Sequence, residues 1–391
     1  MNRVYPITRD VDKNEFELLE QTLRSDGPEA VFDRLIRKAR EEKDSRVLFG
    51  ARMMHVRHRL GLPLIETEPV LDLGGQRPAY ETAFREAARE AGELLLSGGD
   101  IIGAWPYFKA IGEPAPVAAA IENVHPDNVS QSENLDRLVE ISFQEGVNPR
   151  KGFELILEHR GICSAITWFG YNRDYGSRQV CLRLLVRTLY SQVASALKET
   201  IASAEGAAPQ TNSVAELIAG RAWLFEGISS YTDSTHLTSV LRFTPELEDP
   251  ETLRMALELA EYGLCLDPMF HFRGDPPFEN TYLDHAMYLR ALLGQDVDAA
   301  IAHFRKKAEP PAATGGDTAP AEVLIDLLVQ LKRYAEAIQA SVAYLPDANT
   351  TPVNCPSALQ LCQMAGDYAT LRSLARQSED LLGFVAGVIQ G

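Results

Sequence analysis

The sequence predicts an all-α fold, and three observations support that prediction. Apolar residues recur at the i, i+3, i+4 spacing of an amphipathic helix along most of the 391 residues. Long alternating runs of Val, Ile and Thr, which would indicate strands, are missing. Segments rich in Pro and Gly separate the apolar stripes and indicate loops.

The individual helices follow from these stripes. In the first, at 28–48, the apolar residues Val31, Phe32, Leu35 and Ile36 share one helical face. Further helices are expected, in chain order, at about 78–97, 100–109, 114–122, 134–144, 150–159, 178–204, 213–226, 250–264, 281–293, 296–307, 320–331, 334–344, 356–365 and 367–384. Loops are expected at 61–78, 111–116, 205–212, 244–250, 267–278, 309–320 and 345–356.

A recurring unit marks the junction between neighbouring helices. Each copy has an apolar helix, a short turn, an apolar or aromatic residue, and small residues that open the next helix. A Gly after the last turn can take the left-handed conformation that ends a helix, and the following Ala residues allow an antiparallel hairpin to pack closely. Four copies occur, at 93–105, 288–304, 327–338 and 361–371.

These copies resemble the helix hairpins of tetratricopeptide repeats (TPR), and the copy Arg333-Tyr334-Ala335-Glu336-Ala337 is the most similar. The resemblance covers mainly 281–385, where second helices start near 297, 334 and 368, at gaps of 37 and 34 residues against a family period of about 34. It implies a right-handed α-solenoid of antiparallel helix hairpins whose groove binds a protein or peptide partner. The alternative is an all-helical domain whose hairpins look alike because they obey shared packing rules.

The loop signals divide the chain into three regions. We expect an N-terminal helical region at 1–204, a central helical region with an irregular polar loop at 213–308, and C-terminal TPR-like hairpins at 320–391. The stretch 309–318, rich in Pro, Ala and Gly, is the best linker candidate.

The charge balance argues against two classes of partner. Lys and Arg number 38 and Asp and Glu number 55, which gives a formal net charge of -17. Nucleic acids and anionic membranes would repel such a chain in the absence of a basic patch. No apolar run approaches the ~18 residues that span a bilayer, and no secretory signal pattern opens the sequence. The five cysteines form no C-x-x-C pair and indicate free thiols, so we expect a cytoplasmic protein.

One segment, 223–237, breaks the helical pattern with polar side chains beside aromatic ones such as Tyr231. Asp233 and His236 lie three residues apart and could face one point. Both are metal-ligand types, with Glu226 as a third candidate, so a divalent metal at Asp233 and His236 is one hypothesis. In the alternative, Asp233 caps the following helix and His236 is a partly buried histidine.

Two further places are candidates. His159 and Cys163 would share a face of a continuous helix and could act as base and nucleophile or as metal ligands, although Gly161 between them makes a helix end equally plausible. The aromatic loop 267–279 either lines a binding site or anchors the fold. A three-histidine site would form if the fold brought together His236, His271 and His285.

Two functions remain open at this level. No Walker loop, dinucleotide-binding glycine motif, H-E-x-x-H or G-x-S-x-G motif is found in the sequence, so the usual signals for those enzymes are missing. The first hypothesis is a non-enzymatic helical-repeat protein, without a cofactor, that binds a protein or peptide. The alternative is an all-helical metal-binding protein or enzyme with its site around Asp233 and His236.

Overall fold

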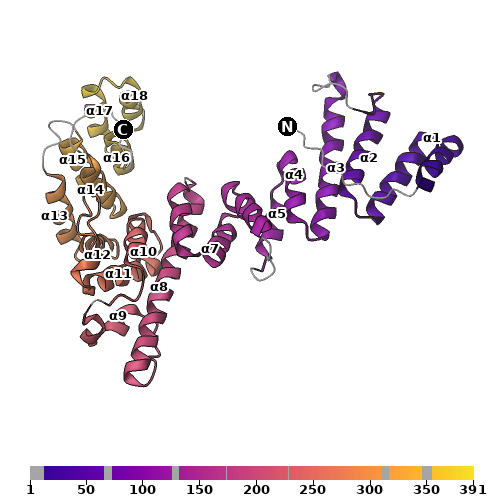
Figure 1. Ribbon diagram of the computed structural model, residues 1–391. Helices are drawn as coiled ribbons and strands as arrows, with labels where there is room; N and C mark the ends of the chain where they lie inside the picture. The colour runs from indigo at the N-terminus through magenta and orange to yellow at the C-terminus, as the bar shows by residue number, and fades with distance from the viewer. Residues whose placement is uncertain are drawn as a thin grey trace. The chain divides into compact units, whose positions relative to one another are not determined.

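The computed structural model describes residues 13–65, 73–125, 132–172, 174–227, 229–309, 317–345 and 355–391. These residues contain helices and loops and no β-strand, apart from an isolated antiparallel bridge between Arg273 and Asn280 (Figure 1). The prediction of an all-α fold is therefore confirmed. The chain divides into two compact units, Met1–His159 and Arg160–Gly391.

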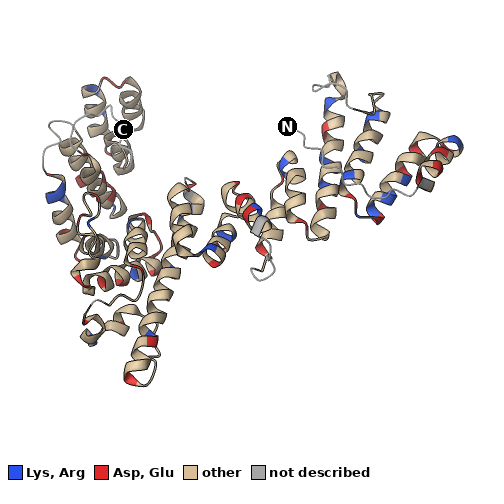
Figure 2. Ribbon diagram, viewed as in Figure 1, with Lys and Arg blue, Asp and Glu red and all other residues tan. Residues whose placement is uncertain are grey.

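In unit 1 the helices α1 to α5 each pack on the next, and α6 packs on α4 and on η3. Their bounds are α1 Lys13–Glu41, α2 Ser45–Arg59, η1 Gly74–Gln76, α3 Arg77–Ser97, α4 Ile101–Ile111, α5 Ala115–Glu122, α6 Ser132–Val139, the π-helical turn η3 Glu140–Gln144, and the start of α7 Pro149–Tyr171. Helix α4 starts where the Asp100 carboxylate accepts a hydrogen bond from the Gly103 N–H at 2.7 Å. Its buried residues Trp105 and Phe108 join one apolar core with residues of α3 and α5. Figure 2 shows charges of both signs on the solvated α1.

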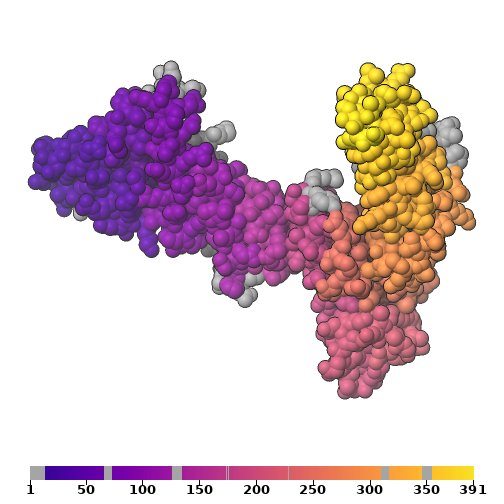
Figure 3. All heavy atoms as spheres, turned by 180° about the vertical axis from the view of Figure 1, so that it is seen from behind, coloured from indigo at the N-terminus to yellow at the C-terminus, as the bar shows by residue number. Residues whose placement is uncertain are grey.

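Unit 2 contains the remaining helices. Their bounds are the rest of α7, α8 Tyr175–Glu205, α9 Val214–Ile218, η4 Ala222–Phe225, α10 Ser234–Leu241, η5 Thr244–Glu246, α11 Pro250–Cys265, η6 Pro268–Phe270, α12 Thr281–Leu292, α13 Val297–Ala308, α14 Ala319–Gln330, α15 Tyr334–Tyr344, α16 Ala358–Ala365, α17 Tyr368–Gln377 and α18 Leu381–Gln390. From α11 to α18 each helix packs against its successor, and Figures 1 and 3 show them following one another in chain order.

The four recurring units of the sequence coincide with helix junctions, namely α3–α4, α12–α13, α14–α15 and α16–α17. At α16–α17 Gly366 takes the left-handed conformation, with φ 67°, and ends the helix as expected. At α14–α15 the left-handed residue is Lys332, with φ 59°, so a non-glycine residue fills the same role. One buried apolar cluster runs through α12 to α17 and includes Phe304, Leu328 and Leu361.

Several expected helices differ in their bounds. The stripe at 28–48 spans the end of α1 and the start of α2, because the Asp44 side chain caps a new helix there. The stripe at 367–384 is likewise divided into α17 and α18 at the capping residue Asp380. The stripe at 213–226 contains the short α9 and the 3-10 turn η4 in place of one helix. The three predicted regions remain predictions; the division of the chain into compact units falls between His159 and Arg160.

Helix α8 is, in the described part of the chain, the helix that is long and apolar enough to cross a membrane by length and composition. Core helices of soluble proteins pass the same test, and 44% of the apolar window of α8 is buried within the protein. Its residues Leu182, Leu185, Val186 and Leu189 are fully buried, and the helix packs against α9, α10 and α11. The expectation of a cytoplasmic protein without a membrane partner stays a prediction.

Candidate functional site

The structure places Asp233 and His236 together at the start of α10. The exposed Asp233 carboxylate accepts hydrogen bonds from the Thr235 N–H at 2.8 Å and from its hydroxyl at 2.6 Å, and so caps the helix. The bonds to Thr235 lower the pKa of Asp233. His236 Nε2 lies 4.0 Å from Asp233 Oδ2. Glu226 is exposed at the end of η4.

Two hydrogen bonds fix Tyr231 within the fold. Its hydroxyl donates to the Leu224 carbonyl at 2.7 Å, and its N–H donates to the Tyr262 hydroxyl at 2.9 Å. Burial raises the pKa of Tyr231. The first bond ties Tyr231 back to η4, and the second ties it to α11.

No group of three or more His, Cys, Asp or Glu side chains in the described part of the chain is placed to hold a metal ion. That statement covers the three histidines His236, His271 and His285. His271 Nε2 instead lies 3.1 Å from the Leu266 carbonyl oxygen. A metal at Asp233 and His236 stays a prediction, with one of its two donors already engaged as a helix cap.

His159 and Cys163 are both exposed. Gly161 between them has φ 75° and ψ 175°, which interrupts α7. The i, i+4 spacing therefore does not by itself place the two side chains on one helical face. Their proposed pairing as base and nucleophile stays a prediction.

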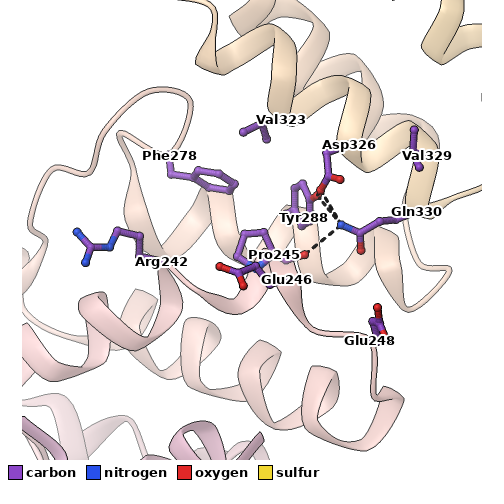
Figure 4. A pocket seen from close by; sticks show the side chains of 10 residues that line it. All are labelled: Arg242, Pro245, Glu246, Glu248, Phe278, Tyr288, Val323, Asp326, Val329 and Gln330. Carbon is purple, nitrogen blue, oxygen red and sulfur yellow. Dashed lines mark hydrogen bonds between the residues drawn. The ribbon is translucent and has the colours of Figure 1, made fainter. Parts of the chain in front are cut away.

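The structure adds a pocket of about 540 Å³ in unit 2, where η5, α12 and α14 meet (Figure 4). Arg242 follows α10, and Phe278 belongs to the loop before α12. The lining residues are Arg242, Pro245, Glu246, Glu248, Phe278, Tyr288, Val323, Asp326, Val329 and Gln330. The walls combine apolar side chains with carboxylates, an arrangement common in binding sites.

A hydrogen-bonded group forms the polar centre of this pocket. The Tyr288 hydroxyl donates to Asp326 Oδ2 at 2.9 Å, and Gln330 Nε2 donates to the same oxygen at 2.7 Å and to the Pro245 carbonyl at 3.0 Å. Burial raises the pKa of Asp326, and the negative charge of Glu246 raises it further, against the opposing effect of the two hydrogen bonds. Burial also raises the pKa of Tyr288 well above its ordinary value, so Tyr288 remains a hydrogen-bond donor.

Asp326 makes no ion pair with any described residue, and its hydrogen-bond donors are neutral. Glu246, by contrast, accepts two hydrogen bonds from Arg178, at 2.7 and 2.6 Å. Figure 4 shows the Arg242 guanidinium directed away from Asp326. The pocket thus holds a partly buried carboxylate whose charge is not neutralised, which favours a ligand that brings a cation or several N–H donors.

The aromatic loop contributes to this pocket and anchors the fold as well. The Phe278 ring lines the pocket and lies against the rings of Tyr288 and Phe304, with centroids 5.8 and 5.6 Å away. Lys307 ties the loop to α12, since its Nζ donates to Glu279 at 2.8 Å and to the buried Asp284 at 2.7 Å. The bond from Lys307 lowers the pKa of Glu279. Both interpretations of the loop therefore find support in its contacts.

Sequence reasoning missed Asp326, Tyr288 and Gln330. One signal was present, because Asp326 is a lone acid inside the apolar run 324–329. A carboxylate on the buried, apolar face of a helix needs a hydrogen-bond or charged partner. Asp326 in this run therefore indicates a candidate binding site. Its pairing with Tyr288, 38 residues earlier, depends on tertiary packing that no local pattern encodes.

No family model, curated protein or solved structure matches the chain.

Proposed function

We propose that this chain is a helical-repeat protein that binds a protein or peptide partner, and that α11 to α18 form a right-handed, TPR-like solenoid. The successive packing of these helices and the left-handed residues Lys332 and Gly366 at their junctions support the proposal. Because each hairpin in such an array buries its apolar face against its neighbours, extended faces remain open to a partner.

The observation that carries the proposal is the un-neutralised carboxylate of Asp326 in the pocket between η5, α12 and α14. We infer that the partner inserts a Lys or Arg side chain here. The apolar side chains of Phe278, Val323 and Val329 suit its methylene stem, while Asp326 and the Pro245 carbonyl would accept hydrogen bonds from its cationic head.

A library of soluble randomised peptides tests this function. We expect peptides with Lys or Arg to be enriched on the full-length protein, and Asp326→Asn to weaken their binding about tenfold or more, as loss of a charge-assisted hydrogen bond implies. The matched control is Asp298→Asn on α13, whose side chain is 90% exposed. Enrichment without basic residues, or equal binding by both variants, contradicts the proposal.

A further inference from the structure

Helix α18 carries no charged side chain, and its one strongly polar residue is Gln390. A helix that is apolar on all sides is normally buried on all sides. One side of α18 is covered, because it packs on α17 (Figure 1). At the buried Gly387 the two helices lie so close that a Cβ would stand 2.8 Å from the side chain of Leu371.

The opposite side of α18 is a stripe of apolar side chains that face solvent, called the α18 stripe below. Its members and their exposed fractions are Leu381 78%, Leu382 84%, Val385 50%, Val388 53% and Ile389 77%. At about 100° of rotation per residue, the five positions lie within an arc of about 120° and form one continuous surface. They expose on the order of 600 Å², the upper end of what a soluble monomer normally exposes in one apolar patch.

The spacing of the stripe suits a second copy of the same helix. The five positions are symmetric about Val385, with apolar residues three and four positions away on either side. Two antiparallel copies related by a twofold axis near Val385 therefore place each Leu381 opposite Ile389 of the other copy. Leu382 then lies opposite Val388 of the other copy, so the stripe is complementary to itself.

The charges at the two ends of α18 favour the antiparallel direction. Glu379 and Asp380 directly precede the helix. Arg372 of α17 lies near its other end, where Nη1 donates to the Gly387 carbonyl at 2.8 Å. Antiparallel pairing brings the acidic end of each copy beside the basic end of the other, whereas parallel pairing would place like charges together.

We propose that the chain forms a twofold-symmetric dimer in which the α18 stripes of two copies pack against each other in antiparallel direction. The pair buries about 1,200 Å² in total, at the lower end of the range for specific protein interfaces, so we expect a Kd on the order of 10 µM. A membrane surface suits the stripe less well, because helices that lie on membranes carry Lys or Arg on their polar face and α18 has neither. No residue of α18 lines the pocket at Asp326, so the dimer goes beyond partner binding and does not depend on it.

Sedimentation equilibrium of the full-length protein tests the dimer. We expect the mass to rise from one copy to two as the concentration passes the Kd. Val385→Glu places two carboxylates at the twofold axis and should raise the Kd about tenfold or more. Val342→Glu on α15 is the matched control, because Val342 is 51% exposed and lies outside the stripe, and it should leave the Kd unchanged.

Cysteine cross-linking tests the direction of pairing by a second route. Under oxidation Val385→Cys should form a covalent dimer, because the two thiols meet at the twofold axis. Leu381→Cys should not, because antiparallel pairing separates its two copies by eight residues, about 12 Å along the helix axis. The unmodified chain, with its exposed Cys163 and Cys265, gives the background.

Four results would overturn the proposal. The chain could remain monomeric up to about 100 µM, or dimerise equally well with Val385→Glu. Cross-linking of Leu381→Cys as efficient as that of Val385→Cys contradicts the antiparallel pairing. A monomer that binds phospholipid vesicles, and loses this binding in Val385→Glu but not in Val342→Glu, would assign the stripe to a membrane surface instead.

Discussion

Replacing Tyr288 by Phe removes one hydroxyl from the polar centre of the pocket and keeps the ring. Tyr288 is 1% exposed, and its hydroxyl donates to Asp326 Oδ2 at 2.9 Å. After the substitution Gln330 remains as a donor to that oxygen. A hydrogen bond to a charged group contributes about 1.5–3 kcal/mol, so we expect the free energy of unfolding to fall by about 2 kcal/mol while Asp326 is ionised.

The pH dependence gives this prediction a second, independent readout. Because burial raises the pKa of Asp326, the folded chain holds this proton more tightly than the unfolded chain. The resulting stabilisation is fully present below the unfolded pKa of about 3.9 and is lost as the pH rises through the folded pKa. The Tyr288 hydroxyl lowers the pKa of Asp326, so Tyr288→Phe should raise it further and widen this pH window upward.

The assay is urea unfolding of the full-length chain, with hydrogen exchange of the α12 and α14 amides to localise the transition. Tyr171→Phe, at a tyrosine that is 77% exposed, should change the free energy of unfolding by less than about 0.5 kcal/mol. Equal effects of the two variants, or a Tyr288→Phe loss that does not depend on pH, would refute the assigned role of this hydrogen bond.

Three other outcomes follow from the geometry of unit 2. Burial lowers the pKa of His285 from 6.5 to about 4. Its contribution to the free energy of unfolding should therefore be fully present above pH 6.5 and fall by on the order of 3 kcal/mol as the pH drops to 4. Acid unfolding curves of His285→Phe should lack this loss. Gly263→Ala would place a Cβ 2.2 Å from the Tyr282 ring and should lower the unfolding free energy by about 1–3 kcal/mol in urea. Lys307→Met removes the cation that pairs with the buried carboxylate of Asp284, so thermal unfolding should show a free energy of unfolding lower by about 3 kcal/mol.

Matched controls exist for the last two substitutions. A Cβ at Gly170 on α7 would meet no atom within 4 Å, so Gly170→Ala should be neutral or stabilising by up to about 1 kcal/mol. Lys306, the exposed neighbour of Lys307, should tolerate Met within about 0.5 kcal/mol. If Gly170→Ala destabilises the protein as much as Gly263→Ala, the contact with Tyr282 does not explain the loss. If Lys306→Met destabilises it as much as Lys307→Met, the ion pair with Asp284 does not explain the loss.

More of the fold than of the candidate site could be predicted from the sequence. Helical periodicity identifies most helices, and Gly366 ends a helix where its backbone freedom suggests. Asp233 was correctly expected to cap α10, since capping depends on residues only a few positions apart. The Tyr288–Asp326 pair depends on side chains from two helices, α12 and α14, and local patterns carry no information about which helices meet.

The proposed contact between Asp326 and a basic side chain of the partner is tested most directly by a double-mutant cycle. Binding of one selected peptide, and of the same peptide with its key Lys replaced by Met, is measured on the unmodified protein and on Asp326→Asn by fluorescence anisotropy. We predict that the two changes are strongly non-additive, with a coupling energy of at least about 1 kcal/mol that shrinks at high salt. Additive effects at every salt concentration would contradict the proposal that Asp326 receives the cation.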